Sequence, residues 1–183
     1  MLDLAAIPTL TTERLLLRRP RAEDFEALLK LLSDPEVTRF LGGAPPDREQ
    51  CWRMLAFLLG HWALRGYGLF LVEERGSGAL VGRLGLLHPE GYPGVELAWT
   101  IGRPFWGRGY AVEAAQAVRV WAADSLGLPP LISLIAPENR RSARVAEKLG
   151  ARPERHIERY GKPIDIWRHA PMGERSADDA GLA

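Results

Sequence analysis

The expected fold is built around one run of residues, Arg103-Pro104-Phe105-Trp106-Gly107-Arg108-Gly109-Tyr110-Ala111-Val112-Glu113-Ala114-Ala115. The run joins a β-branched, strand-like segment to a segment whose apolar residues recur at helical spacing. Gly107 and Gly109 therefore open a helix, and the unpaired N–H groups and positive dipole of a first helical turn can hold a phosphate. The alternative is that both glycines only make a tight strand-to-helix turn.

Two known types of phosphate-binding loop do not match this run. A Walker loop needs Gly-Lys followed by Ser or Thr, which is absent, and a dinucleotide fingerprint needs a small residue where Val112 stands. The segment Trp106-Gly107-Arg108-Gly109-Tyr110-Ala111 instead resembles the cofactor loop of the GNAT superfamily of N-acetyltransferases, Gln/Arg-x-x-Gly-x-Gly/Ala. Trp106 departs from the first position of that motif. This departure, together with the Glu-Ala that follows, makes the segment look like the RimJ/RimL branch. Members of that branch acetylate ribosomal-protein N-termini and other amines.

Length and composition indicate the number of domains, the kinds of partner and the cellular location to expect. The 183 residues are 46% hydrophobic, which predicts one domain over residues 1–170 with a sizeable core. A net charge of +1 and a pI near 8.0 give no basic field that would attract a nucleic acid. A single cysteine, Cys51, fits a reducing cytoplasm. Residues 1–10 lack the pattern of a signal peptide and residues 54–64 are too short to span a bilayer, so we expect a cytoplasmic protein without membrane contacts. The sequence leaves open whether the protein forms a homodimer.

Periodicity predicts an α/β (α+β) chain. Strands are expected at residues 12–18, 68–74, 79–88, 95–101, 131–135, 156–160 and 164–169, and helices from residue 21 to Asp34-Pro35 and at residues 47–65, 107–126 and 140–149. The helix at 47–65 is expected to face the core with Trp52, Leu55, Ala56, Leu59 and Ala63. Residues 171–183 are expected to form a disordered tail. The order of elements is that of the GNAT family, which implies a mixed, mostly antiparallel sheet flanked by helices.

The resemblance implies acetyl-CoA as the donor. The strands at 95–101 and 131–135 would splay apart, and the pantetheine arm would bond to the open strand as an added strand does. The residues implied in cofactor binding are Trp99, Thr100, Ile101, Gly107, Arg108, Gly109, Tyr110, Ala111, Val112, Asn139 and Ser142. On sequence alone, Trp99 and Ile101 are equally good core residues, and Asn139 is also a good helix N-cap.

Glu96 is the candidate general base, because strand interiors rarely keep a carboxylate without a reason. An amine with a pKa near 10 is only about 0.1% neutral at pH 7, whereas an N-terminal amine with a pKa near 7.8 needs less help. An ordinary glutamate is a weak base, so Glu96 would need a raised pKa or a water relay. The alternative is a solvated or ion-paired strand residue.

Asn139 begins a segment that resembles the family's Asn-x-x-Ser/Ala motif ending in Glu-Lys-Leu-Gly. By that match, Asn139 would bond the pantetheine amides and Ser142 would lie near the thioester sulfur. Many relatives carry a tyrosine four residues after Ser142, as the acid that protonates the leaving thiolate, but Ala146 stands there. Ser142 or water must then serve, and a thiol is a leaving group that needs little help.

The remaining candidates are weaker. His88 ends a strand near the expected acceptor cleft. It either orients or deprotonates the amine, or it is simply a surface residue. His61, His156 and His169 lack metal-ligand spacing, so no metal is expected. Cys51 is expected in the core.

The sequence therefore predicts an N-acetyltransferase that moves the acetyl group of acetyl-CoA directly to a primary amine, either a protein or peptide N-terminus or a small molecule. Two rivals stay open. One is a non-catalytic acyl-CoA-binding sensor or structural module of the same fold, and the other is a Rossmann-type nucleotide-binding enzyme.

Overall fold

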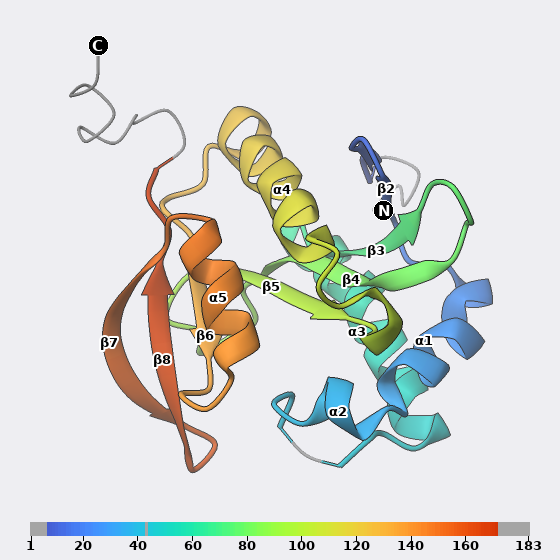
Figure 1. Ribbon diagram of the computed structural model, residues 1–183, viewed down its shortest axis with the longest axis horizontal. Helices are drawn as coiled ribbons and strands as arrows, with labels where there is room; N and C mark the ends of the chain where they lie inside the picture. Colours follow the sequence, from blue (N-terminus) through green and yellow to red (C-terminus); the bar gives the residue numbers. More distant parts are fainter. Residues whose placement is uncertain (1–6, 43, 172–183) are drawn as a thin grey trace.

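One eight-stranded sheet organises the protein in a computed structural model that describes residues 7–42 and 44–171 (Figure 1). The strand order is β1-β2-β3-β4-β5-β6-β8-β7, and all neighbours are antiparallel except β5 and β6. This confirms the expected mixed, mostly antiparallel sheet. The strands are β1 (Leu10–Thr11), β2 (Leu15–Arg18), β3 (Leu69–Glu74), β4 (Leu80–Leu87), β5 (Glu96–Ile101), β6 (Ile132–Ile135), β7 (Arg152–Arg159) and β8 (Lys162–Arg168). The expected tail at residues 171–183 lies, apart from residue 171, outside the described residues.

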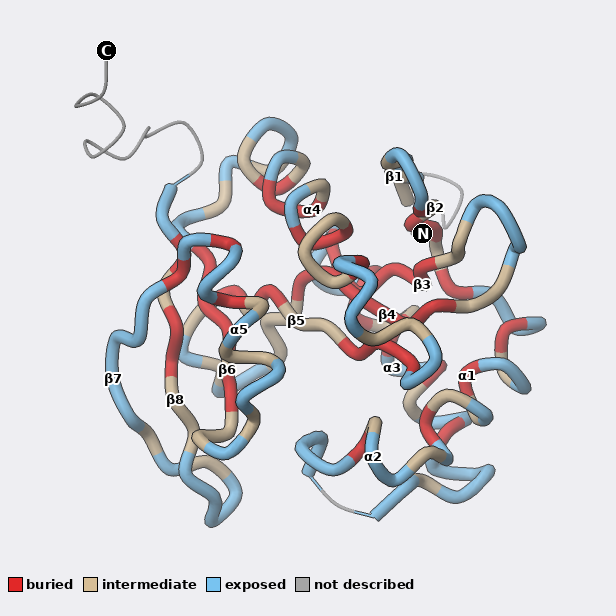
Figure 2. Tube along the Cα trace, viewed as in Figure 1, coloured by how far each residue is buried: buried red, intermediate tan, exposed pale blue. Residues whose placement is uncertain are grey.

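Helices pack on both faces of the sheet. The longer ones are α1 (Phe25–Leu32), α3 (Arg48–Arg65), α4 (Tyr110–Leu126) and α5 (Arg140–Lys148), and one turn, α2 (Pro35–Thr38), follows α1. Buried residues of α1 and α3 pack with Leu69 and Leu71, whereas those of α4 pack with Leu84, Leu86 and Leu97. Buried positions accordingly follow the inner strands and the inward sides of the helices (Figure 2).

The inward face expected for α3 is right for Leu55, which is buried, and for half-buried Leu59, but wrong for the other three residues. Trp52 is 54% exposed and Ala56 and Ala63 are also exposed, while Leu58 and Trp62 are buried. Because α3 carries apolar residues on several sides, its sequence pattern does not fix which side faces the core. Trp52 instead packs edge-on against Phe25 of α1, with 5.6 Å between ring centroids.

Several boundaries also differ from the expectation, and two of the differences have a plain physical cause. α4 begins at Tyr110 rather than at residue 107, because Gly107 and Gly109 adopt left-handed backbone with φ of 77° and 80°. β7 begins at Arg152, ahead of the expected residue 156. Its first residues are polar and exposed at the edge of the sheet, so no hydrophobic alternation marks them.

The sheet opens between β5 and β6, as the resemblance to the GNAT family implies. The two strands pair only at Glu96 and Ile132, although β5 continues to Ile101. β6 meanwhile pairs along its whole length with β8. The gap that results divides the sheet into β1–β5 and β6–β8–β7.

Candidate functional site

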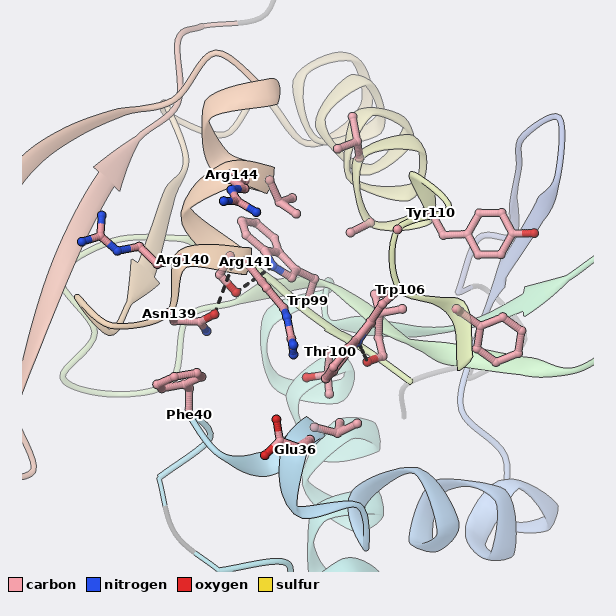
Figure 3. Close-up of a pocket in the computed structure, with 18 of the residues that line it drawn as sticks. Glu36, Phe40, Trp99, Thr100, Trp106, Tyr110, Asn139, Arg140, Arg141 and Arg144 are labelled. Atoms are coloured by element: carbon pink, nitrogen blue, oxygen red, sulfur yellow. Dashed lines mark hydrogen bonds between the residues drawn. The ribbon is translucent and has the colours of Figure 1, made fainter. Parts of the chain in front are cut away.

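A pocket of about 570 Å³ lies beside this gap, between the end of β5, the start of α4, α5 and α2 (Figure 3). Most of the residues expected to bind the cofactor line it. They are Trp99, Thr100, Ile101, Gly107, Gly109, Tyr110, Ala111, Val112, Asn139 and Ser142. Arg108 and Glu96 do not line it.

The start of α4 presents backbone N–H groups to this pocket. Gly109 is the N-cap and has no side chain, and the first amide bonded within the helix is that of Glu113, which donates to Gly109 O at 3.1 Å. Glu113 itself is drawn away, because its carboxylate accepts bonds from Thr12 Oγ1 at 2.6 Å and Arg14 Nε at 2.7 Å. The amides of Tyr110, Ala111 and Val112 therefore remain available to an anion.

The open edge of β5 is the second backbone feature. Strand alternation directs the N–H and C=O of Trp99 and Ile101 toward the gap, since Val95 O faces β6 and accepts from Ile132 N at 2.9 Å. The backbone groups of Thr100 face β4, where it pairs with Arg83, so the expectation that they hold an added strand is wrong. Thr100 contributes to the pocket wall instead.

Trp106 also touches this edge. Its Nε1 donates to Ile101 O at 2.7 Å, and its ring lies 4.0 Å from the Arg141 guanidinium. One lone pair of Ile101 O is thus already bonded. Among the described residues, Trp99 is left as the one whose backbone N–H and C=O both lack a hydrogen-bond partner on that side.

Asn139 and Ser142 approach β5 from the other side of the gap. Asn139 Oδ1 accepts from Ser142 N at 3.2 Å and caps α5, as the capping alternative predicts, while both residues line the pocket. Ser142 Oγ accepts from Trp99 Nε1 at 3.3 Å. Because the oxygen accepts that bond, the hydroxyl proton stays free to be donated.

The cations of the pocket are not those expected. The Arg108 guanidinium turns toward Glu74, at 3.5 Å, and lies over the Phe105 ring. Sequence reasoning missed the cationic side chains that do line the pocket, namely Arg39, Arg140, Arg141, Arg144 and Lys148. A signal was present, because residues 140, 144 and 148 recur at the spacing of one helix face. Arg140 points away from Arg141 and Arg144 (Figure 3).

Glu96 lies at the opposite end of β5 from the pocket, where β5 and β6 separate. Burial raises the pKa of its carboxyl to about 7, while the backbone N–H of Leu134 and the charge of Arg159 act in the other direction. Arg159 is held over the Tyr92 ring, 4.0 Å from its centroid, and donates to Gly91 O at 3.1 Å. A carboxyl with a pKa near 7 can accept a proton at neutral pH, as a general base requires.

The other titratable candidates have structural partners. His61 Nδ1 lies 2.8 Å from Tyr67 O, and its Nε2 accepts from the N–H of His88 at 2.9 Å. Burial lowers the pKa of His61 and raises the pKa of Cys51, which lies in the core. Ala146, at the position of the family's tyrosine, is fully buried with Ile135 and offers no acid.

Within residues 7–42 and 44–171, no group of three or more His, Cys, Asp or Glu side chains is placed to hold a metal ion. None of the helices in that same part of the chain has the length and hydropathy needed to span a membrane.

Comparisons with known proteins agree with this arrangement. Residues 14–152 match the family model of the acetyltransferase (GNAT) domain. YkkB of Bacillus subtilis is 31% identical over 166 residues, which cover 86% of this chain and 93% of YkkB. The crystal structure of an acetyltransferase from Agrobacterium tumefaciens is 36% identical with a TM-score of 0.81, over 90% of this chain and 95% of that one. Ribosomal-protein-S5-alanine acetyltransferase from Vibrio fischeri shares the fold. It is 14% identical, with a TM-score of 0.70, over 92% of this chain and all 100% of that one.

Proposed function

The chain belongs to the GNAT family of acetyltransferases, and on that premise we propose that it transfers the acetyl group of acetyl-CoA directly to a primary amine. One observation carries the proposal: the free amides at the start of α4 and the open edge of β5 line the same pocket. The first suits a diphosphate and the second suits an extended chain of amides, and both parts occur in acetyl-CoA.

The residues present fit that donor in size and charge. The pocket of about 570 Å³ lies within the range of small-molecule sites. The amides of Tyr110, Ala111 and Val112 would hold the diphosphate, Trp99 the pantetheine arm, and Asn139 its amide groups. Arg141, Arg144 and Lys148 would supply the positive charge that the phosphates require, a role that Arg108 was expected to take.

Bound acetyl-CoA supplies a thioester whose acetyl carbon is open to attack by an amine. Glu96 accepts the proton that the amine loses as its nitrogen bonds to the acetyl carbon. Ser142 or water gives a proton to the thiolate that is released when the carbon–sulfur bond breaks. The raised pKa of Glu96, about 7, supports this division of roles, because it matches a base to neutral pH.

The acceptor is a primary amine, either a protein or peptide N-terminus or a small molecule. The likeness of the Trp106–Ala111 segment to the RimJ/RimL branch favours a polypeptide N-terminus. An α-amine with a pKa near 7.8 is also easier to deprotonate than a lysine amine near 10.4, so a single carboxylate suffices for it.

Release of free thiol tests the proposal. The purified protein is incubated with acetyl-CoA and a panel of N-terminal peptides and small amines, and free coenzyme A is titrated. We expect release that depends on the acceptor. Binding of acetyl-CoA with no release for any acceptor would favour the non-catalytic module, whose best support is Ala146 in place of the family's tyrosine. Thermal stabilisation by NAD in place of acetyl-CoA would favour a Rossmann-type enzyme.

A further inference from the structure

A side chain replaces a backbone bond at the point where β5 and β6 separate. At the Glu96–Ile132 pair, a ladder bond runs from Ile132 N to Val95 O, at 2.9 Å. The next carbonyl of β5 that faces β6 is Leu97 O, and it accepts from Ser133 Oγ at 2.7 Å. In a continued parallel ladder the backbone N–H of Leu134 would fill that place. That N–H instead faces the Glu96 carboxyl, whose pKa it lowers.

His169 completes this arrangement from the end of β8. Its Nε2 lies 3.0 Å from Ser133 Oγ, and Ser133 and His169 are 2% and 1% exposed. Since Leu97 O only accepts, the serine proton must point to it, and the imidazole must donate its Nε2–H to Oγ. The buried Nδ1 is then the unprotonated nitrogen, which agrees with its having no hydrogen-bond partner in the described structure.

We propose that Ser133 and His169 are positioning residues, which hold Leu97 O and with it the Leu97–Ala98 peptide, one residue beyond Glu96, at the fork of the sheet. The bonds form one chain, from the His169 imidazole through the Ser133 hydroxyl to Leu97 O, and it links three strands. Glu96 precedes Leu97 directly, and Trp99 is two residues further. The pair therefore sets the relation between the candidate base and the strand that would bind the donor. The inference rests on the proposed function through the role of Glu96.

The surroundings keep this chain of bonds in one protonation state. Burial lowers the pKa of His169 to about 4, with Arg119 of α4 and Arg168 of β8 acting in the same direction. The imidazole is therefore neutral near pH 7 and carries the single N–H that the bonds require. Glu96 is faced by the Leu134 N–H from β6, by Arg159 from β7 and by Tyr92 from the loop before β5.

Kinetics of three variants test the proposal. Ser133→Ala removes the bond to Leu97 O, His169→Phe removes its support, and His169→Gln keeps an N–H donor near the Nε2 position. We expect Ser133→Ala and His169→Phe to lower kcat about 10-fold through misplacement of the base, with the KM for acetyl-CoA changed less than about twofold. His169→Gln should recover most of kcat. The matched control is His156→Gln, since His156 is an exposed histidine of the same hairpin that pairs with Asp165.

A titration that needs no turnover separates this inference from the proposed function. The Glu96 carboxyl is followed by carbon-13 NMR against pH in each folded variant. We expect the pKa of Glu96 to fall by about one unit in Ser133→Ala, because water enters the fork, and to stay unchanged in His156→Gln. An unchanged pKa in Ser133→Ala and His169→Phe would overturn the inference. Absence of turnover by the wild-type protein with every amine would overturn the proposed function and leave this titration valid.

Discussion

At the scale of single residues, Glu96 is a side chain whose environment departs from what its type prefers. It begins β5 between the buried residues Val95 and Leu97, and burial raises the pKa of its carboxyl to about 7. A carboxylate kept there at neutral pH costs folding free energy, because its ionised form is less well solvated than in the unfolded chain. Sites that sacrifice stability in this way are frequently sites of chemistry.

Glu96→Gln should therefore stabilise the fold and slow the reaction. A carboxyl whose pKa is raised on folding loses its stabilising contribution as pH rises from the unfolded value of 4.5 through about 7. We expect the variant to gain on the order of 1 kcal/mol in unfolding free energy at pH 8 and little at pH 5. Its kcat should fall about 100-fold. Chemical denaturation at both pH values and steady-state kinetics check the two effects, and wild-type kcat/KM should rise with pH through about 7. An unchanged kcat would remove Glu96 as the base.

At the scale of elements, α5 supplies the cationic side of the pocket and the start of α4 supplies its amides. Arg141 is fixed over Trp106, and Arg144 and Lys148 follow it along the helix. Arg108 lies in the loop before α4 but is engaged with Glu74. The cofactor's phosphates would thus sit between two helices, with neutral N–H donors on one side and charged side chains on the other.

Substitutions in α5 should weaken donor binding more than substitution of the loop arginine. We expect Arg144→Gln to raise the KM for acetyl-CoA about 10-fold, as loss of one charge-assisted bond implies, and Arg108→Gln to have the smaller effect. The difference in KM between the two variants should become smaller as ionic strength increases, because salt screens exposed charges. Initial rates at several salt concentrations measure this, with Arg155→Gln on β7 as a control outside the pocket. A larger effect of Arg108→Gln would mean that its side chain turns into the pocket when the donor binds.

Helices and strands whose apolar residues recur at a clear spacing could be predicted from the sequence, and those without such a spacing could not. The hairpin of β3 and β4, the strand β5 and the helices α4 and α5 occur where their apolar spacing and glycines indicate. The short helix α2 and the first residues of β7 are too polar or too brief for a period to show. Among candidate residues, ten of the expected pocket positions line it, because backbone position follows from the motif. The direction of the Arg108 side chain does not follow from a motif, since Glu74 lies 34 residues earlier in the chain and is brought near only by folding.

At the scale of the whole molecule, the chain is divided by the open fork into β1–β5 and β6–β8–β7. The bonds that join the two parts across the gap include the Glu96–Ile132 pair, the Ser133–Leu97 bond and the Trp99–Ser142 bond. Arg119 of α4 adds a link at its far end, where its Nη1 donates to Leu149 O at 2.6 Å. A ligand that fills the gap would bond to both parts at once, and its binding energy would be coupled to their association.

Acetyl-CoA should therefore stabilise the entire fold and protect the two sides of the gap together. At 100 times its Kd, a ligand that binds only the native state adds about 2.7 kcal/mol. For a chain of this size that corresponds to a rise in Tm of about 5–10 °C. Hydrogen exchange should slow at Trp99 and at the first turn of α4 on one side, and at α5 on the other. NAD at the same concentration serves as the control and should leave both measurements unchanged. Protection confined to one side of the gap would contradict a ligand that bridges it, because a diphosphate held by α4 alone would leave α5 exchanging as before.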